Sequence, residues 1–334
     1  MTIPVIFGCA GTALTPAERE LFRKTDPLGL IVFSRNCAEP DQICALVSDF
    51  REAVGRPAAP VLIDQEGGRV QRLQPPHWRA APPPACFGAI AEQDRQRGRE
   101  AAVLNARLIA SELAELGIDV DCVPCVDLRM PGAHQVIGDR ALGEDPNLVA
   151  DMGRAVAEAF LAGGVLPVVK HIPGHGRALA DSHHELPVVT ASAAELERAD
   201  FVPFRALADM PWAMTAHVVY TAYDEAHPAT LSRRVIDRVI RGHIGFGGVL
   251  LSDDLNMKAL AGDLGELAAS SIEAGCDLAL HCNGDLVEMA RVAAALRPIA
   301  PATWARLEAG RARLGMAPLD RGAAVARLDE ILAA

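Results

Sequence analysis

The stretch VLPVVKHIPGHGRALADSHHE occupies residues 165–185, and its first part decides the fold that we expect for the whole chain. Residues 165–169 form a short apolar run, which is typical of a buried strand. Pro173 and Gly174 then prevent a regular helix, so the remainder is predicted to be a long loop leaving the strand end. The stretch also holds four of the ten histidines of the chain. Because long loops on rigid scaffolds tend to carry function, we expect residues 170–185 to contribute to a functional site.

Seven further apolar runs resemble the one at residues 165–169, and helical patterns separate them. Alternating short strands and amphipathic helices predict parallel βαβ units, and eight such units close into a (β/α)8 TIM-type barrel of the α/β class. A doubly wound open sheet is the competing architecture. The expected strands are Val5–Gly8, Gly29–Phe33, Pro60–Ile63, Val120–Val126, Val165–Val169, Trp212–Ala216, Gly248–Leu251 and Asp277–Leu280.

Two of the helical patterns begin with a recognisable capping signal. Thr15 is followed by Pro16 and then by Glu18, as at a capped helix start. Ser192 stands three residues before Glu195, which is the spacing of a capping box. The expected helices are Pro16–Lys24, Asp41–Val54, Asp94–Leu116, Asn147–Ala162, Ala193–Leu207, Ser232–Arg241, Gly265–Ala274 and Asp285–Leu296.

The chain is expected to form a single domain over residues 1–334, since barrels of this kind often reach that length. The proline-rich piece Gln74–Pro84 is predicted to be an extended surface connection rather than a linker between domains. The tail, about residues 303–334, has apolar residues at helical spacing and is expected to pack outside the barrel.

The charge of the chain limits its partners. The net charge of −11 provides no basic field for nucleic acid or for anionic lipid, so neither partner is expected. A small, neutral or locally recognised ligand is easier to accommodate, and the protein is expected to act as a monomer. Residues 1–10 lack a basic leader with a long apolar core, and no run of about 18 apolar residues occurs elsewhere. A soluble cytoplasmic protein is therefore the expectation.

Eight cysteines are scattered along the chain, several of them inside apolar runs. This distribution predicts reduced, mostly buried thiols rather than a disulfide framework. Cys122 and Cys125 form a C-x-x-C pair, but no second pair stands at zinc-finger spacing, so metal or redox use is not favoured.

Polar residues follow most of the expected strands. Enzymes with this barrel place their chemistry on the loops after the carboxyl ends of the strands, so these residues should converge at one mouth. Together they predict a polar pocket for a hydroxyl-rich ligand. They are Ser34–Asn36, Asp64–Arg72, Asp127 with Gly138–Arg140, Lys170–His171, His217, Ser252–Asp254 and His281.

Three kinds of chemistry fit the histidine-rich loop. The first is metal-dependent hydrolysis, since imidazole and carboxylate groups can bind zinc or iron. Against it, the spacing is not helical, and Lys170 would repel a cation. The candidate ligands are His171, His175, His183, His184 and Asp181. The second is acyl transfer by Ser182. Adjacent residues do not generally form the required hydrogen-bond chain, and no G-x-S-x-G motif is present.

The third is glycoside hydrolysis, which needs a nucleophilic carboxylate and an acid that protonates the leaving oxygen. Asp253 stands at the end of a strand, where a rigid element can hold a nucleophile. His183 has an imidazole suited to proton transfer near neutral pH, and Asp181 two residues earlier could orient that ring. A turn that only braces the loop remains the structural alternative for Asp181–His183.

Four sequence blocks, in this order along the chain, resemble the signature blocks of glycoside hydrolase family 3. More closely, they resemble its single-domain bacterial β-N-acetylglucosaminidases (β-hexosaminidases) of peptidoglycan recycling. One departure is Ile172, where the common form of the motif has phenylalanine. The blocks are DQEGGRVQR at 64–72, GDR at 138–140, KHIPGHG at 170–176 with DSH at 181–183, and SDDL at 252–255.

The resemblance implies a retaining mechanism with no metal or organic cofactor. Asp253 would attack to form a covalent glycosyl-enzyme, and His183 paired with Asp181 would act as acid and then as base. The acetamido group of the substrate would not be the nucleophile. The implied substrates are muropeptides with N-acetylglucosamine β-1,4-linked to anhydro-N-acetylmuramic acid. The implied sugar-binding residues are Asp64, Arg72, Arg140, Lys170 and His171.

Some alternatives stay open at this point. Asp254 directly follows the implied nucleophile, and strand alternation predicts that only one of Asp253 and Asp254 faces the site. A histidine acid/base also admits a phosphorolytic enzyme, in which phosphate replaces water. A non-catalytic sugar-binding barrel is a further possibility, although its mark would be the loss of Asp181, His183 or Asp253, and all three are present.

Overall fold

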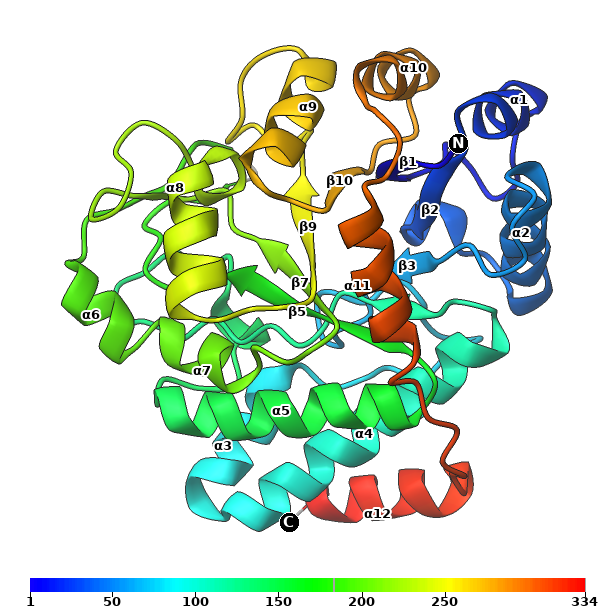
Figure 1. Ribbon diagram of the computed structural model, residues 1–334. Coiled ribbons are helices and arrows are strands. Elements are labelled where there is room, and N and C mark those ends of the chain that lie inside the picture. Colours follow the sequence, from blue (N-terminus) through cyan, green and yellow to red (C-terminus); the bar gives the residue numbers. More distant parts are fainter. Residues whose placement is uncertain (183, 334) are drawn as a thin grey trace.

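Eight parallel strands close into a barrel, and helices surround it (Figure 1). The computed structural model describes residues 1–182 and 184–333. Neighbouring barrel strands follow one another around the ring in chain order, so the (β/α)8 prediction is confirmed and the open sheet is excluded. The barrel strands are β1 (Ile3–Phe7), β2 (Pro27–Val32), β3 (Val61–Ile63), β4 (Val120–Asp121), β5 (Leu166–Ile172), β7 (Trp212–Thr215), β9 (Val249–Asp254) and β10 (Leu278–His281).

The apolar runs form barrel strands because both faces of a parallel sheet are covered. Every residue of β1, β2 and β5 is buried, inside against the barrel core or outside against helices. A separate two-stranded parallel sheet pairs β6 (Val188–Val189) with β8 (Val219–Tyr220).

The helices largely follow the predicted pattern. The predicted helix cap at Thr15 and the predicted capping box at Ser192 are both present, and each is a capping box, formed with Glu18 and Glu195 respectively. The α-helices that match single predictions are α1 (Pro16–Thr25), α2 (Pro40–Ala53), α4 (Arg95–Glu115), α5 (Pro146–Ala162), α9 (Leu264–Ala274) and α10 (Leu286–Ala295). Short 3₁₀ turns occur at η1 (Ser34–Asn36), η2 (Gly138–Arg140) and η3 (Ala229–Leu231).

Two predicted helices are interrupted, and one helix was missed. The helix expected over residues 193–207 divides into α6 (Ala193–Arg198) and α7 (Phe201–Ala206), since Pro203 cannot donate a hydrogen bond and its ring would clash with the preceding turn. The helix expected at residues 232–241 becomes α8 (Arg233–Val235) continued by the π-helix η4 (Ile236–His243). α3 (Pro84–Gln93), directly after the proline-rich connection, was not predicted.

The fourth strand is much shorter than predicted. Regular pairing ends at Asp121, because Pro124 has no N–H to contribute to a ladder. The chain nevertheless continues beside β5: the amide of Val126 donates to the carbonyl of Lys170 at 2.9 Å, and the amide of Lys170 donates to the carbonyl of Pro124 at 3.1 Å. This irregular segment carries Asp127 to the carboxyl end of the barrel.

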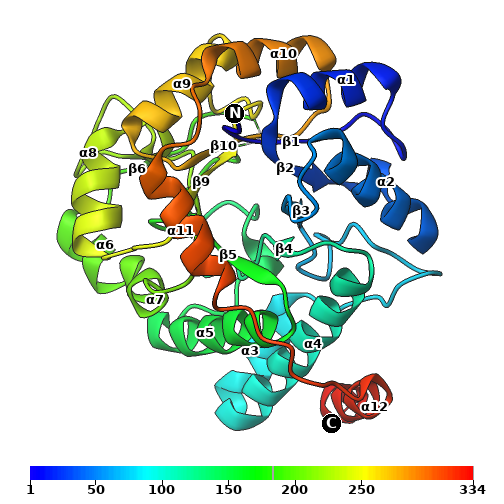
Figure 2. The same cartoon turned by 45° about the vertical axis from the view of Figure 1, so that its right-hand side comes forward.

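The tail closes the opposite end of the barrel. α11 (Pro301–Arg311) crosses the barrel in Figure 2, and Thr303 donates to Asp277, just before β10, at 2.7 Å. α12 (Arg321–Ala333) packs on α4. Since α11 covers the amino ends of the strands, a ligand pocket has its opening at the carboxyl ends.

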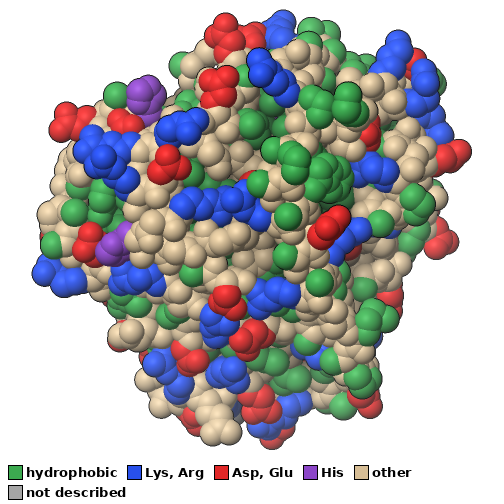
Figure 3. Space-filling view, viewed as in Figure 1, with side chains coloured by type: hydrophobic (Ala, Val, Ile, Leu, Met, Phe, Trp, Pro, Cys, Tyr) green, Lys and Arg blue, Asp and Glu red, His purple; other side chains and the backbone are tan. Residues whose placement is uncertain are grey.

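On the face shown in Figure 3, acidic and basic side chains intermix. In the part of the chain that the structure describes, no helix combines the length and the apolar character needed to cross a membrane. All eight cysteines are free thiols, and five of them are buried.

Candidate active site

A pocket of about 250 Å³ opens at the carboxyl ends of the barrel strands. It brings together five residues predicted to bind the sugar and the predicted nucleophile, from segments far apart in the sequence. Apolar side chains complete its wall. The lining residues are Phe33, Asp64, Val70, Arg72, Arg140, Lys170, His171, Met214, Asp253, Asp254, Met257, Leu280 and Cys282.

A buried charge cluster, formed by Asp64, Glu66, Arg140 and Lys170, lies at the base of this pocket. The Lys170 ammonium is 2.8 Å from Asp64 Oδ1 and 2.6 Å from Glu66 Oε1. Arg140 binds both oxygens of Glu66, at 2.9 Å through Nε and 2.8 Å through Nη2. The side chains of Lys170 and Glu66 are 2% and 1% exposed, so these ion pairs are held away from solvent. The cluster fixes the positions of the groups that a sugar would contact.

The charges in this cluster stabilise one another strongly enough to outweigh the effect of burial, which disfavours the ionised forms. Burial would raise the pKa of Glu66, but the Arg140 guanidinium and the Lys170 ammonium outweigh it and lower the pKa to about 2. Burial would likewise raise the pKa of Asp64, but Lys170 and Arg72 hold it well below its usual range. Burial would lower the pKa of Lys170, and the carboxylates of Asp64 and Glu66 raise it instead. All these groups are therefore ionised at neutral pH.

Glu66→Gln is expected to lower the free energy of unfolding by about 3–5 kcal/mol, because it leaves Lys170 and Arg140 with an uncompensated buried charge. Urea unfolding at neutral pH measures the change. The matched control is Glu100→Gln, which breaks the exposed pair with Arg327 and should cost at most about 1 kcal/mol. Equal losses in the two variants would contradict the role of burial.

Arg72 forms the rim of the pocket on the side of β3. Its guanidinium lies 3.3 Å from Asp64 Oδ2 and 4.9 Å from the centre of the Phe33 ring. Arg35 approaches the same ring, at 5.1 Å, and donates to the carbonyl of Cys9. Phe33 therefore holds Arg72 in place by a cation–π contact. Of the two arginines, Arg72 lines the pocket and Arg35 does not.

Asp253 and Asp254 both line the pocket, which corrects the expectation that only one of them would. The pairing of β9 with β10 shifts at this point: Leu278 pairs with Leu251, but Leu280 pairs with Asp254. Such a bulge breaks the alternation of side chains along a strand. The amide of Asp254 donates to Asp253 Oδ1 at 2.8 Å, so the first carboxylate is oriented by the backbone of the second.

The carboxyl group of Asp254 is harder to ionise than usual. Burial raises its pKa to about 6, and the nearby charge of Asp253 adds to the rise. Its Oδ1 accepts from the amides of Asn256 at 3.2 Å and Cys282 at 3.1 Å, which only partly offset this effect. Asp254 therefore changes charge beside Asp253 in mildly acidic solution.

Asp254→Asn is expected to raise the free energy of unfolding by about 1–2 kcal/mol at pH 7.5 and by much less at pH 4. The folded protein holds the Asp254 proton more tightly than the unfolded chain, so ionisation opposes folding progressively as the pH rises from about 4 to about 6. Urea unfolding of both proteins across this range measures the difference. A difference that stays constant with pH would contradict the elevated pKa.

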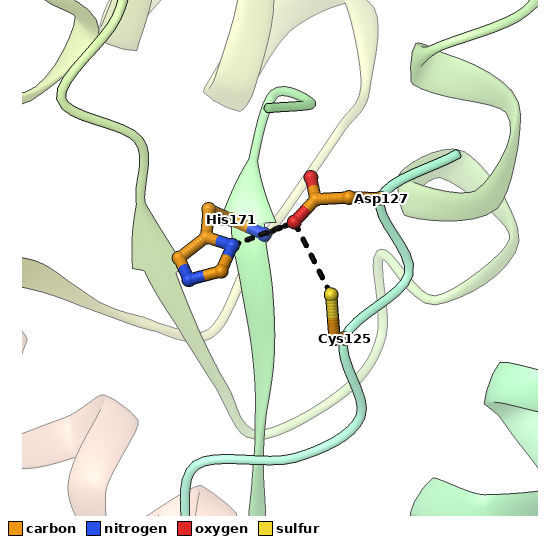
Figure 4. Close-up of side chains that lie close together, drawn as sticks. All are labelled: Cys125, Asp127 and His171. Carbon is orange, nitrogen blue, oxygen red and sulfur yellow. Dashed lines mark hydrogen bonds and ion pairs between the residues drawn. The ribbon is translucent and has the colours of Figure 1, made fainter. Parts of the chain in front are cut away.

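Asp127 lies between His171 and Cys125 (Figure 4) and also binds the backbone of His175. Its Oδ2 lies 2.6 Å from His171 Nδ1 and accepts the Cys125 thiol at 3.3 Å, while its Oδ1 accepts the amide of His175 at 2.6 Å. Burial would raise the pKa of Asp127, but the charge and hydrogen bond of His171 lower it well below its usual range. The ring of His171 is thereby oriented, and its Nε2 lies 3.5 Å from Arg140 Nη2.

Among the described candidate ligands, the loop histidines do not gather around one point as the ligands of one metal would. His184 is exposed and lies 4.0 Å from Asp181, whereas the rings of His171 and His175 are buried. A group that could hold a metal is present among the described residues, but it consists of His171 with Cys125 and Asp127, whose ligand atoms lie within 4.8 Å of one another.

The predicted acid/base pair is described only in part. His183 lies outside the described residues, so its role stays a prediction. Asp181 is described, with a side chain 18% exposed, and its carbonyl accepts the amides of His184 and Glu185 at 2.9 and 3.0 Å. Asp181 is not among the residues that line the pocket.

Two other strand-end histidines do not line the pocket. His217 is fully buried; its Nδ1 lies 2.7 Å from Thr230 Oγ1 and its Nε2 lies 3.0 Å from the carbonyl of Asp254. His281 is also fully buried, with Nε2 3.6 Å from Glu288. His217 thereby supports the end of β9, and His281 packs edge-on against the ring of Phe7.

Sequence reasoning counted Glu66 and Asp127 among the polar residues after strands but gave neither a specific role, although both organise the pocket. Glu66 stands two residues after Asp64 in a quoted motif, a spacing that directs two side chains to one side of an extended segment. Asp127 was recognised as a residue after a strand, but its partner His171 lies 44 residues away. That separation gives no local signal of the pairing.

Comparison with known proteins assigns the chain to a protein family. Residues 10–314 match the sequence pattern of the glycosyl hydrolase family 3 N terminal domain. A β-hexosaminidase of Thiobacillus denitrificans is 42% identical over 288 residues, which cover 84% of this chain and 78% of that protein. A β-hexosaminidase of Bordetella avium is 38% identical over 284 residues, covering 84% and 80% of the two chains.

Solved structures agree with the sequence relatives. NagZ from Neisseria gonorrhoeae in complex with N-trifluoroacetyl-D-glucosamine has a TM-score of 0.87 and 33% identity, over 99% of this chain and 98% of that one. A glycoside hydrolase family 3 β-N-acetylglucosaminidase from Paenibacillus has a TM-score of 0.81 and 33% identity over 98% of this chain. The matched region is 60% of the Paenibacillus chain.

Proposed function

This chain belongs to glycosyl hydrolase family 3 and is a glycoside hydrolase of the β-hexosaminidase type, and on that premise we propose that it is a retaining exo-β-N-acetylglucosaminidase. The observation that carries the proposal is the position of Asp253, at the end of β9 in a pocket walled by the buried charge cluster. A carboxylate held there can attack a sugar whose hydroxyls are bound by the cluster.

In the first step, an Asp253 oxygen bonds to the anomeric carbon while the bond from that carbon to the glycosidic oxygen breaks. The leaving oxygen takes a proton from His183, which Asp181 orients. The amide of Asp254 supports this role for Asp253, since its bond to Oδ1 at 2.8 Å holds the carboxylate in one rotamer. The product is a covalent glycosyl-aspartate.

In the second step, His183 removes a proton from water, and the water oxygen attacks the anomeric carbon. The bond to Asp253 breaks, and the sugar leaves with its original configuration. Two inversions at one carbon give retention. Because Asp253 supplies the nucleophile and His183 the acid and base, the scheme requires no metal or organic cofactor.

The terminal N-acetylglucosamine is assigned to the floor of the pocket. Asp64, Arg72, Arg140, Lys170 and His171 all line it. The charged partners that they already have fix their orientation before a ligand arrives, which reduces the entropy lost on binding. The N. gonorrhoeae relative solved with N-trifluoroacetyl-D-glucosamine supports a ligand of this type.

The proposed natural substrates are cytoplasmic muropeptides in which N-acetylglucosamine is β-1,4-linked to anhydro-N-acetylmuramic acid. Support comes from the resemblance of four sequence blocks to the single-domain enzymes of peptidoglycan recycling. The match to NagZ from Neisseria gonorrhoeae covers 98% of that chain.

Water is proposed as the second-step nucleophile rather than phosphate. Arg140 is already paired with Glu66, and Lys170 with Asp64. An incoming phosphate would therefore find neither of these buried cations uncommitted, whereas a neutral water needs no such partner. N-Acetylglucosamine 1-phosphate as the main product in phosphate buffer would overturn this choice.

Trapping with a 5-fluoro analogue of an activated N-acetyl-β-glucosaminide tests the proposal. The analogue slows both steps and lets the covalent intermediate accumulate. Mass spectrometry of the digested protein should locate the label on Asp253. A label on Asp254, or an inverted product detected by NMR, would rule out the mechanism.

A further inference from the structure

His175 is a buried histidine of the KHIPGHG motif that the proposed reaction does not use. Its side chain is only slightly exposed, and its backbone amide donates to Asp127 Oδ1 at 2.6 Å. Its ring lies edge-on to that of His171, with ring centres 5.7 Å apart. The backbone at His175 is thus held by the same carboxylate that orients the ring of His171.

The outer nitrogen of this ring reaches the loop that carries the acid/base pair. His175 Nε2 lies 3.2 Å from Ser182 Oγ, and Ser182 is itself buried. Ser182 is the residue next to Asp181 on one side and next to His183 on the other. A bond to its hydroxyl therefore acts on the point of the loop between the two proposed catalytic groups.

A second bond holds Ser182 from the opposite direction. Its carbonyl accepts the amide of Ala259 at 3.1 Å, and Ala259 lies in the segment that follows β9 and Asp253. Ser182 is therefore bound at its side chain by the motif behind the sugar site and at its backbone by the segment after the nucleophile. These two contacts set the distance between the loop and the pocket.

The imidazole can keep this contact over the working pH range. Burial lowers the pKa of His175 to about 4, and the charge of His171 acts in the same direction, while Asp127 and Asp253 oppose it. A neutral ring has one N–H and one acceptor nitrogen, so it can pair with a hydroxyl in either orientation.

We propose that His175 is a positioning residue, which docks the 176–185 loop through Ser182 so that the acid/base pair stands within reach of the glycosidic oxygen. The inference rests on the proposed function, because it assigns the loop to proton transfer. It goes further in stating what fixes that loop. A hydrogen bond that only braced the fold would affect every substrate alike. A bond that positions an acid affects mainly the substrates whose leaving group must be protonated.

The test compares kcat/KM for two N-acetyl-β-glucosaminides, one with a 4-nitrophenyl leaving group and one with an alkyl leaving group. Ser182→Ala removes the hydroxyl and leaves His175 in place. It is expected to lower kcat/KM for the alkyl substrate by roughly 10- to 100-fold, as for a small misplacement of a catalytic group, and for the aryl substrate by less than about 3-fold. KM for the aryl substrate should stay unchanged.

Four further variants make the result specific. His175→Gln should reproduce the pattern, and combining it with Ser182→Ala should add little, since both remove one contact. Ser182→Thr keeps a hydroxyl and should restore most of the activity. The control is Ser271→Ala, since Ser271 is buried in α9, donates only within that helix at 2.8 Å and does not line the pocket. It should leave the ratio of the two substrates unchanged.

Asp181→Asn, measured alongside, separates the two possible failures. If it shows the leaving-group dependence and Ser182→Ala does not, the docking role of His175 is wrong and the proposed mechanism stands. If neither variant shows it, the proton-transfer role of the loop fails as well. Equal losses for the two substrates in a Ser182→Ala protein with wild-type thermal stability would also overturn the proposal.

Discussion

Replacing Asp253 by alanine is expected to lower kcat for the release of 4-nitrophenol from its N-acetyl-β-glucosaminide by roughly 10⁴-fold or more. The substitution removes the oxygen that forms the covalent bond, and no other group can supply that bond at the same place. Asp254, although it lines the same pocket, has Oδ1 engaged by two backbone amides. Binding of N-acetylglucosamine should persist, because the charge cluster is untouched. Release of the phenol is followed by absorbance and binding by calorimetry.

Two controls accompany this variant. Asp237→Asn alters an exposed aspartate of η4, away from the pocket, and should leave turnover unchanged. Adding azide should partly restore activity in Asp253→Ala with formation of the α-glycosyl azide, because a small anion can attack where the carboxylate was. Turnover of Asp253→Ala near the wild-type rate would refute the assignment of the nucleophile.

Replacing His183 by alanine is expected to lower kcat/KM for a natural disaccharide by about 10²- to 10⁴-fold, the usual contribution of a general acid. The loss for a 4-nitrophenyl substrate should be small, because that leaving group departs without a proton. The value of kcat/KM reports the step in which the leaving group departs, so later hydrolysis of the intermediate does not obscure the comparison.

His184 provides the matched control for that experiment. It is adjacent in sequence, has the same side chain and is 74% exposed, with its imidazole 4.0 Å from Asp181. His184→Ala should therefore keep the wild-type ratio of the two substrates. If His184→Ala gave the selective loss and His183→Ala did not, the acid/base role would pass to the neighbouring residue.

The barrel was predictable because its signal is local. A run such as residues 165–169 is apolar at every position, which a strand covered on both faces requires, and the capping box of Ser192 and Glu195 lies within four residues. The errors in the prediction arose where one residue overrode a pattern. Pro203 divides a helix that apolar spacing extends without interruption, and Pro124 ends a strand that hydrophobicity continues.

The site was predictable as a set of positions but not as a set of contacts. Lys170 follows a strand, so its place at the mouth of the barrel follows from the fold class. Its bonds to Asp64 and Glu66 join residues more than 100 positions apart, and a sequence does not state which distant charges meet. The bulge in β9 was hidden for the same reason, since it is defined by the register against β10.

The sequence by itself determined the order of strands and helices, the end of the barrel that carries polar residues and the family to which its motifs belong. These properties depend on side-chain periodicity and on residues close together in the chain. Only the tertiary structure decided that Glu66 and Asp127 organise the pocket, that Asp253 and Asp254 both face it, and that His175 reaches Ser182. Those outcomes depend on closure of the barrel, which brings the ends of separate strands to one place and removes water from the charges that meet there.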